Sequence, residues 1–262
     1  MMGAMSIAAT GMGAQQSRID LVANNLANLS TAGFKASQMS FHDLMSQEVR
    51  PGGTLLASGG QVPTSVEMGL GTQVAATERV FTQGSFQQTG NPTDMTIQGE
   101  GFFQVTLPDG TVGYTRDGSF SKDSQGNLVT AEGYILSPPV TIPANATNIS
   151  VSSDGKVSVT VPGQSAPQQV GQLTLATFPN DQGLQAAGNN VYLQTAASGT
   201  PVTGNPAAQG FGSVMQGYLE GSNVSEVNEM INMISAQHAY EVNAKVISSA
   251  DQMLSIVAEM KR

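Results

Sequence analysis

MMGAMSIAATGMGAQQSRIDLVANNLANLSTAGFK, residues 1–35, carries an apolar repeat with a period of seven residues. One position of the repeat holds Met5, Met12, Ile19 and Leu26, and the other holds Ala8, Gln15, Val22 and Leu29. Spacings of three and four residues place these side chains on one stripe of a helix, a pattern typical of a coiled-coil seam. Only Arg18 and Asp20 are charged before Lys35. A helix with so little charge is expected to be surrounded by other protein.

Residues 224–262 predict a second long helix, because they contain neither Gly nor Pro. Asn223 and Glu226 have the spacing of a capping box at its start. Its apolar stripe comprises Val227, Ile231, Ile234, Val242, Val246, Met253, Ile256 and Met260. Either helix alone would be marginal in water. The two stripes are therefore expected to bury against each other and against neighbouring copies.

Composition excludes several classes of function. The chain has 262 residues, enough for one large domain or two to three small ones, and its net charge is −9. Such a charge argues against binding to nucleic acid or to an anionic membrane surface. No segment reaches the roughly 18 apolar residues that span a bilayer, so the chain is not expected to be membrane-embedded. It has no Cys and no signal-peptide pattern at its start, and we expect export, if any, without a cleaved leader.

The segment after the first helix is expected to be irregular. The helix should end near Ser30, with Gly33 in the left-handed conformation that ends helices. Phe34, Phe41, Leu44 and Met45 suggest a short amphipathic continuation. Residues 46–63 (SQEVRPGGTLLASGGQVP) hold four Gly and two Pro and predict a loop or linker.

The middle of the chain changes to the period of two that is typical of strands. Residues 74–81 predict a strand, and Phe103 and Val105 alternate with polar residues. Asp109-Gly110 predicts a hairpin turn, and similar pairs recur at intervals typical of an all-β unit. The expected fold is α+β, with terminal helices forming a coiled-coil-like stalk around a central all-β domain. The expected regions are an N-terminal helix (1–34), a connecting region (35–85) with the insert 46–63, a β domain (86–210), a return connector (211–223) and a C-terminal helix (224–262).

Three ordered motifs carry a family resemblance. They are ANNLAN at 23–28 with STAGFK at 30–35, GEGFF at 99–103 with YTRDGSF at 114–120, and AYE at 239–241 with DQML at 251–254. In these motifs the chain resembles the flagellar rod and hook (axial) proteins over nearly its whole length. The family-motif residues near the N-terminus are Asn24, Asn25, Ala27, Asn28, Gly33 and Phe34. Its asparagines are expected to hydrogen-bond between packed helices, where an amide can fix register.

The resemblance implies a structural subunit of the bacterial flagellar basal body. The resemblance points to the distal part of the rod, with the proximal rod and the hook as the near alternatives. Implied partners are further copies in an open helical filament, proximal rod and hook proteins, the surrounding rings and the flagellar export apparatus. The implied location is the rod that crosses the periplasm. An insert like 46–63 is associated with a stiff rod; its residues here include Ser46, Arg50, Pro51, Gly52, Gly53 and Pro63.

Two other classes of function are open alternatives. A secreted adhesin-type module would be a stable monomer with an exposed binding face. A hydrolase would need a convergent acid, base and nucleophile, and the pattern offers none, since His42 and His238 are the only histidines. No Asp-x-Asp-x-Asp-Gly calcium loop occurs. We therefore expect no catalytic, metal or cofactor site.

Overall fold

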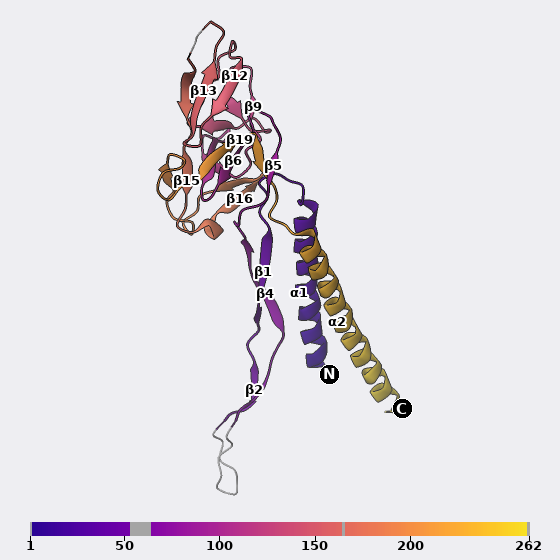
Figure 1. Cartoon of the computed structure of the whole chain (residues 1–262). Coiled ribbons are helices and arrows are strands. Elements are labelled where there is room, and N and C mark those ends of the chain that lie inside the picture. Colours follow the sequence, from indigo (N-terminus) through magenta and orange to yellow (C-terminus); the bar gives the residue numbers. More distant parts are fainter. Residues whose placement is uncertain (1, 53–63, 164–165, 261–262) are drawn as a thin grey trace. The chain divides into compact units, whose positions relative to one another are not determined.

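The chain folds into two compact units, one helical and one rich in strands. The computed structural model describes residues 2–52, 64–163 and 166–260 (Figure 1). The helical unit comprises Met1–Leu26, Ser37–Glu78 and Ser225–Arg262, and the β unit comprises Ala27–Ala36 and Arg79–Val224. The combination of terminal helices with a β-rich middle confirms the α+β fold class.

Two long helices form the first part of the helical unit. They are α1 (Met2–Ala27) and α2 (Glu226–Met260). Arg18 Nη2 donates to Asn232 Oδ1 at 3.3 Å, and Gly11 lies against the side-chain amide of Asn243. As the residue numbers rise along α1, those of the residues they contact on α2 fall, so the two helices are antiparallel neighbours (Figure 1). The second predicted long helix is present, over Glu226–Met260.

A narrow β ribbon completes the helical unit. β1 (Ser37–Asp43) pairs with β4 (Thr72–Arg79), and further along β2 (Gln47–Arg50) pairs antiparallel with β3 (Val66–Met68). The strand predicted over 74–81 corresponds to β4. The predicted amphipathic continuation through Phe41 is wrong, because that segment is the strand β1. The predicted loop at 46–63 begins instead with β2, and residues 53–63 lie outside the described part of the chain.

Two predicted helix boundaries also need correction. α1 ends at Ala27, before Ser30, and turns follow it. Gly33 does adopt the left-handed conformation, with φ of 68°. α2 begins at Glu226, so Asn223 is not its capping residue. The Asn223 side chain accepts from Ala36 N and donates to Val80 O, which leaves it no role at the helix end.

The described residues of the β unit form four sheets. The largest has nine strands in the path β16-β17-β8-β7-β11-β10-β9, with β15 joining β7 to β18. Its members are β7 (Phe102–Thr106), β8 (Val112–Thr115), β9 (Ser121–Lys122), β10 (Leu128–Val129), β11 (Ile135–Ser137), β15 (Leu175–Thr177), β16 (Gln185–Gly188), β17 (Val191–Leu193) and β18 (Val202–Gly204). A 3₁₀ turn, η1 (Asp181–Gly183), precedes β16.

Three smaller sheets complete the β unit. A three-stranded sheet contains β12 (Asn148–Val151), β13 (Lys156–Thr160) and β14 (Gln168–Gln172). β6 (Met95–Gln98) pairs with β19 (Ser213–Gln216), and β5 (Phe86–Gln88) pairs with β20 (Tyr218–Glu220). Residues 211–223, expected as a return connector, therefore carry two strands that pair with the beginning of the β unit.

The hairpin between β7 and β8 forms as its sequence predicts. Asp109 Oδ1 accepts from the backbone N–H and the hydroxyl of Thr111, and Gly110 has φ of 82°. The two strands pair antiparallel with Phe103 opposite Thr115. Gly113 leaves room for Leu107 and Val191, whose side chains lie where a Cβ would be. The turn therefore fixes the register of the strands that carry the core.

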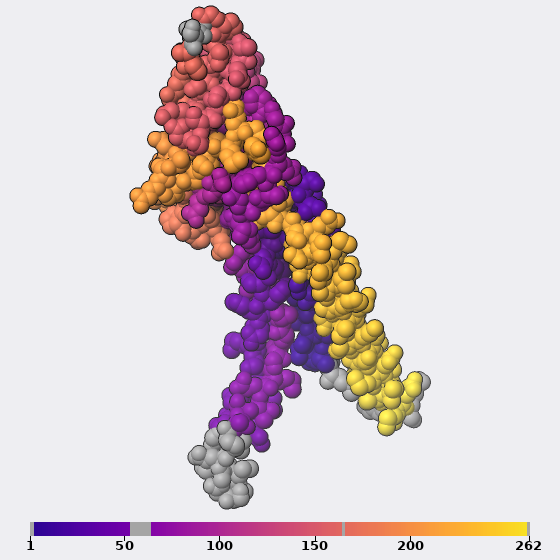
Figure 2. Space-filling model, viewed as in Figure 1, coloured from indigo at the N-terminus to yellow at the C-terminus, as the bar shows by residue number. Residues whose placement is uncertain are grey.

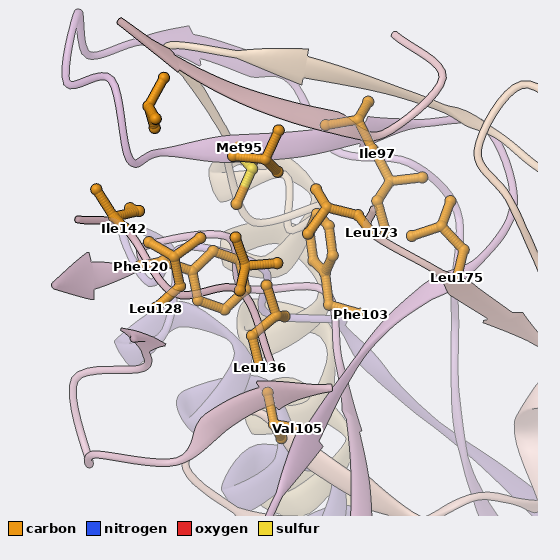
Figure 3. Close-up of a cluster of buried hydrophobic side chains, with 14 of the residues drawn as sticks. Met95, Ile97, Phe103, Val105, Phe120, Leu128, Leu136, Ile142, Leu173 and Leu175 are labelled. Carbon is orange, nitrogen blue, oxygen red and sulfur yellow. The ribbon is translucent and has the colours of Figure 1, made fainter. Parts of the chain in front are cut away.

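The core of the β unit lies under these strands (Figure 3). Phe103 and Val105 are fully buried, as their alternation predicts, and Phe103 meets Phe120 edge to face at 5.3 Å. Phe102 is buried as well, in a second, aromatic cluster with Tyr114 and Tyr192. β7 is therefore covered on both faces.

Candidate functional site

The predicted stripe of α2 lies exposed along the whole helix. The relative exposure of its eight residues runs from 42% at Val246 to 82% at Met260. Figure 2 shows α2, in orange to yellow, uncovered along the side that faces the viewer. A contiguous exposed apolar face of this kind marks an interaction surface more often than a solvated one. We call these eight residues the outer stripe: Val227, Ile231, Ile234, Val242, Val246, Met253, Ile256 and Met260.

A different face of α2 meets α1. Its residues recur every seven positions and are small or polar: Glu229, Ala236, Asn243 and Ala250. Ala236 and Ala250 are buried, and Asn243 lies against Gly11. Val227 and Ile231 are each two residues from Glu229 in the sequence, so each lies about 200° around the helix axis from the face that meets α1. The expectation that the outer stripe buries against α1 is therefore wrong, because small side chains let the helices approach on another face.

The predicted stripe of α1 is partly covered. Val22 and Ala8 are buried. The other predicted members are half-buried: Met5, Met12, Gln15, Ile19, Leu26 and Leu29. Ala14, which the repeat does not include, is also buried. The role of these residues in an interface between copies stays a prediction.

One residue of the family motif joins three elements of the helical unit. Asn25 is 1% exposed. Its side chain accepts from Ser37 N at 2.9 Å and donates to Ser37 O at 2.9 Å, as a neighbouring strand would. The same amide nitrogen lies 3.2 Å from Glu229 Oε1 of α2. The expected hydrogen bond between helices is therefore present, and the amide also holds the start of β1.

The other motif residues are placed differently. Asn24 and Ala27 are exposed, and Asn28 Oδ1 accepts from the Thr31 hydroxyl at 3.2 Å. Gly33 and Phe34 are buried in the β unit, where the Arg79 guanidinium lies 5.9 Å from the Phe34 ring centroid. The motif thus does not form one cluster. It marks the end of α1 and the segment that follows.

The predicted insert is described only at its edges. Ser46 Oγ donates to Glu67 Oε2 at 3.2 Å, and Arg50 pairs with Val66 at the end of the β2–β3 ladder. Pro51 and Gly52 are exposed. Gly53 and Pro63 lie outside the described residues. The contribution of the insert to stiffness stays a prediction.

A buried ion cluster in the β unit escaped the sequence analysis. The Glu220 carboxylate contacts Lys35 Nζ at 2.5 Å and Arg116 Nη1 at 3.5 Å. The side chains of Lys35 and Glu220 are fully buried, and that of Arg116 is 5% exposed. Burial lowers the pKa of Lys35 from its ordinary value of 10.5, while the Glu220 carboxylate opposes that shift. Because the three residues are far apart in the sequence, no local pattern links them.

Neither a metal site nor a membrane span is found in the described part of the chain. Residues 2–52, 64–163 and 166–260 hold no group of three or more His, Asp or Glu side chains placed to bind a metal ion. None of the described helices is both long and apolar enough to cross a membrane.

Comparison with known families places the chain among flagellar axial proteins. Three family models match: "Flagella basal body rod protein" at residues 5–35, "Flagellar hook protein FlgE/F/G D1 domain" at 96–159 and "Flagellar basal body rod FlgEFG protein C-terminal" at 215–260. They cover α1 with the segment after it, much of the β unit, and α2. The resemblance read from the three motifs is thereby confirmed.

Individual relatives sharpen the assignment. The flagellar basal-body rod protein FlgG of Buchnera aphidicola subsp. Acyrthosiphon pisum is 45% identical over 99% of this chain and 100% of its own length. FlgG of Caulobacter vibrioides is 45% identical with the same coverage of both chains. The flagellar hook protein FlgE of Helicobacter mustelae is 32% identical over 95% of this chain and 63% of its own length. The chain therefore belongs to the FlgG family of flagellar basal-body rod proteins.

Proposed function

We propose that this chain is the structural subunit of the distal rod of the bacterial flagellum. Many copies pack their helices into a tube that carries torque from the motor to the hook and lets exported proteins pass. The full-length match to FlgG proteins supports this proposal over a hook role, because the hook relative is less similar and only 63% of its length is matched. Function here is packing, and no catalytic role is assigned.

The outer stripe is the observation that carries the proposal. It stands in solvent in a single chain, although burying an apolar side chain is worth about 1.5–3 kcal/mol. A second copy can cover it, and the chain's own α1 does not. A contact between unlike surfaces that does not close into a ring propagates as an open helical filament. The coiled-coil-like stalk of the sequence prediction would then form between subunits as well as within one.

The proposed surroundings follow from the same role. The subunit leaves the cytoplasm through the flagellar export apparatus and adds to the proximal rod below, within the basal-body rings. The hook protein adds above it. We further propose that the insert at 46–63, which starts in the exposed β2–β3 ribbon, stiffens the shaft by contacting neighbouring subunits.

The test compares two substitutions at sites of equal exposure. Ile231 on α2 and Val202 on β18 are both 57% exposed. We expect Ile231→Asp and Val202→Asp to leave the dilute monomer folded, since each new carboxylate faces water. In a dry interface between copies, a lone carboxylate costs several kcal/mol, roughly, so Ile231→Asp should block filament formation while Val202→Asp should not.

Assembly is measured by sedimentation velocity and electron microscopy over a range of concentrations, and by recovering rods from cells that carry each variant. Loss of filaments with Ile231→Asp alone supports the proposal. Equal assembly by the two variants would show that the outer stripe is not an interface. A wild-type chain that stays monomeric at all concentrations and is absent from isolated basal bodies would overturn the function itself.

A further inference from the structure

Wherever the chain passes between the two units, it does so through one of three short segments of the β unit. The chain crosses at 26–27, 36–37, 78–79 and 224–225. Within the β unit, the three segments next to these crossings are residues 27–36, 79–84 and 220–224. Whatever holds these segments together also fixes where the four crossings leave the β unit.

The segments are hydrogen-bonded to one another. Gly33 N donates to Glu220 O at 2.8 Å, and Val80 N donates to Ala36 O at 2.9 Å. The Asn223 side chain accepts from Ala36 N at 2.7 Å and donates to Val80 O at 2.7 Å. Each segment is therefore tied directly to the other two.

The Glu220 carboxylate sits among the same three segments. Its Oε1 accepts from Lys35 Nζ at 2.5 Å and from Gly84 N at 2.9 Å. Lys35 Nζ also donates to Thr82 O at 2.8 Å. One carboxylate oxygen thus contacts one residue from each of the other two segments.

Arg116 connects this carboxylate to the core of the β unit. Arg116 directly follows β8 in the sequence. Its guanidinium lies 3.5 Å from Glu220 Oε2 and 5.3 Å from the ring centroid of Phe102 on β7. The cluster therefore holds two buried cations and one buried anion. Removing the anion would take from both buried cations the carboxylate they share, which is far more costly than losing an exposed ion pair.

We propose that the Glu220 carboxylate is a latch that locks the three crossing segments to one another and to the β core. It acts as a positioning residue: within the β unit, it holds the three segments from which the backbone leaves that unit. With the latch open, the segments loosen while the core strands stay formed. None of the predicted interface residues is part of it.

The test is hydrogen exchange of the full chain, measured by mass spectrometry at low concentration. We expect Glu220→Gln, which keeps the shape but removes the charge, to speed exchange about tenfold or more at residues 33–36, 80–84 and 220–224. Exchange in β7 and β8 should stay within about twofold of the wild type. The control is Asp154→Asn, which breaks the exposed Lys156–Asp154 pair of the same unit and should change none of these rates.

A second variant covers the case in which Glu220→Gln does not fold. Lys35→Met keeps the carboxylate with Arg116 and Gly84, so it should release residues 33–36 and leave residue 84 protected. Exchange in the three segments that matches the Asp154→Asn control, or a uniform rise that includes β7 and β8, would overturn the latch with either variant. Because the measurement uses dilute monomer, its outcome is independent of whether the chain forms filaments.

Discussion

The two units differ in what they bury. In the β unit, large side chains such as Phe103, Val105 and Leu175 have no exposure. In the helical unit, the buried residues are mainly alanines, with Val22 and Asn25, while the large apolar side chains of α2 stand in solvent. A unit with a core of its own is a finished fold. A unit that buries alanine and exposes isoleucine has its large apolar side chains still uncovered, and we propose that other copies cover them.

The largest expected effect tests this contrast directly. Phe103→Ala should destabilise the β unit by about 3–5 kcal/mol, because it leaves a cavity beside Phe120 in a fully buried site. Ile231→Ala on the outer stripe should change monomer stability by less than about 0.5 kcal/mol. Denaturant unfolding of both variants, followed by circular dichroism, gives the two values. Similar costs at the two sites would break the contrast between the units.

A smaller effect is expected where the helical unit does have a buried clamp. Asn25→Ala should cost about 1–3 kcal/mol, because it leaves the N–H and C=O of Ser37 without their partner. The loss should appear as faster hydrogen exchange at the end of α1 and in β1, with the β unit unchanged. Asn228→Ala, at an exposed position of α2, is the matched control and should have almost no effect. An equal effect of both variants would show that Asn25 is not a clamp.

The smallest effect concerns a charge that the β unit buries. Burial raises the pKa of Asp117 above its ordinary value of 3.8, so the folded chain binds a proton more readily than the unfolded one. Stability from this group is therefore lost as pH rises from 3.8 through the folded pKa. Asp117→Asn should slightly raise the Tm at pH 7, and the gain should disappear below pH 3.8. The new amide oxygen can still accept from Ser119 N.

Asp109 supplies a control with the opposite sign. Its side chain is exposed, and the hydrogen bonds from Thr111 lower its pKa below 3.8. The stability it contributes is present above pH 3.8 and is lost as pH falls through the folded pKa. Asp109→Asn should thus lower the Tm at pH 7. Thermal unfolding of both variants between pH 3 and 7, roughly, checks the two signs. A lower Tm for Asp117→Asn at pH 7 would contradict the burial argument.

Local patterns predicted much of this fold. The absence of Gly and Pro located α2, and Asp109-Gly110 located the hairpin between β7 and β8, because both signals act within a few residues. The strand β1 (SQMSFHD) was missed. It lies in a narrow, mostly exposed ribbon and so lacks the clean apolar alternation that identifies a half-buried strand.

The interface side was predicted less completely. Spacing identified the outer stripe but could not say which partner each face of α2 meets, because alanines can pack as closely as larger residues. The expected role of Asn25 between helices was found, yet its bonds to Ser37 had no signal in the sequence. The cluster of Lys35, Arg116 and Glu220 depends on a closed fold, so it could not be predicted before the fold was known.

The interleaving of the two units has a consequence for how the molecule comes into being. α1 is made first, yet its neighbour α2 is made last, after the whole β unit. During synthesis from the N-terminus, α1 therefore has no α2 beside it until the residues from 226 onward have been made. The proposed outer stripe therefore exists only after α2 has been made, and a truncated chain that stops within the β unit lacks it.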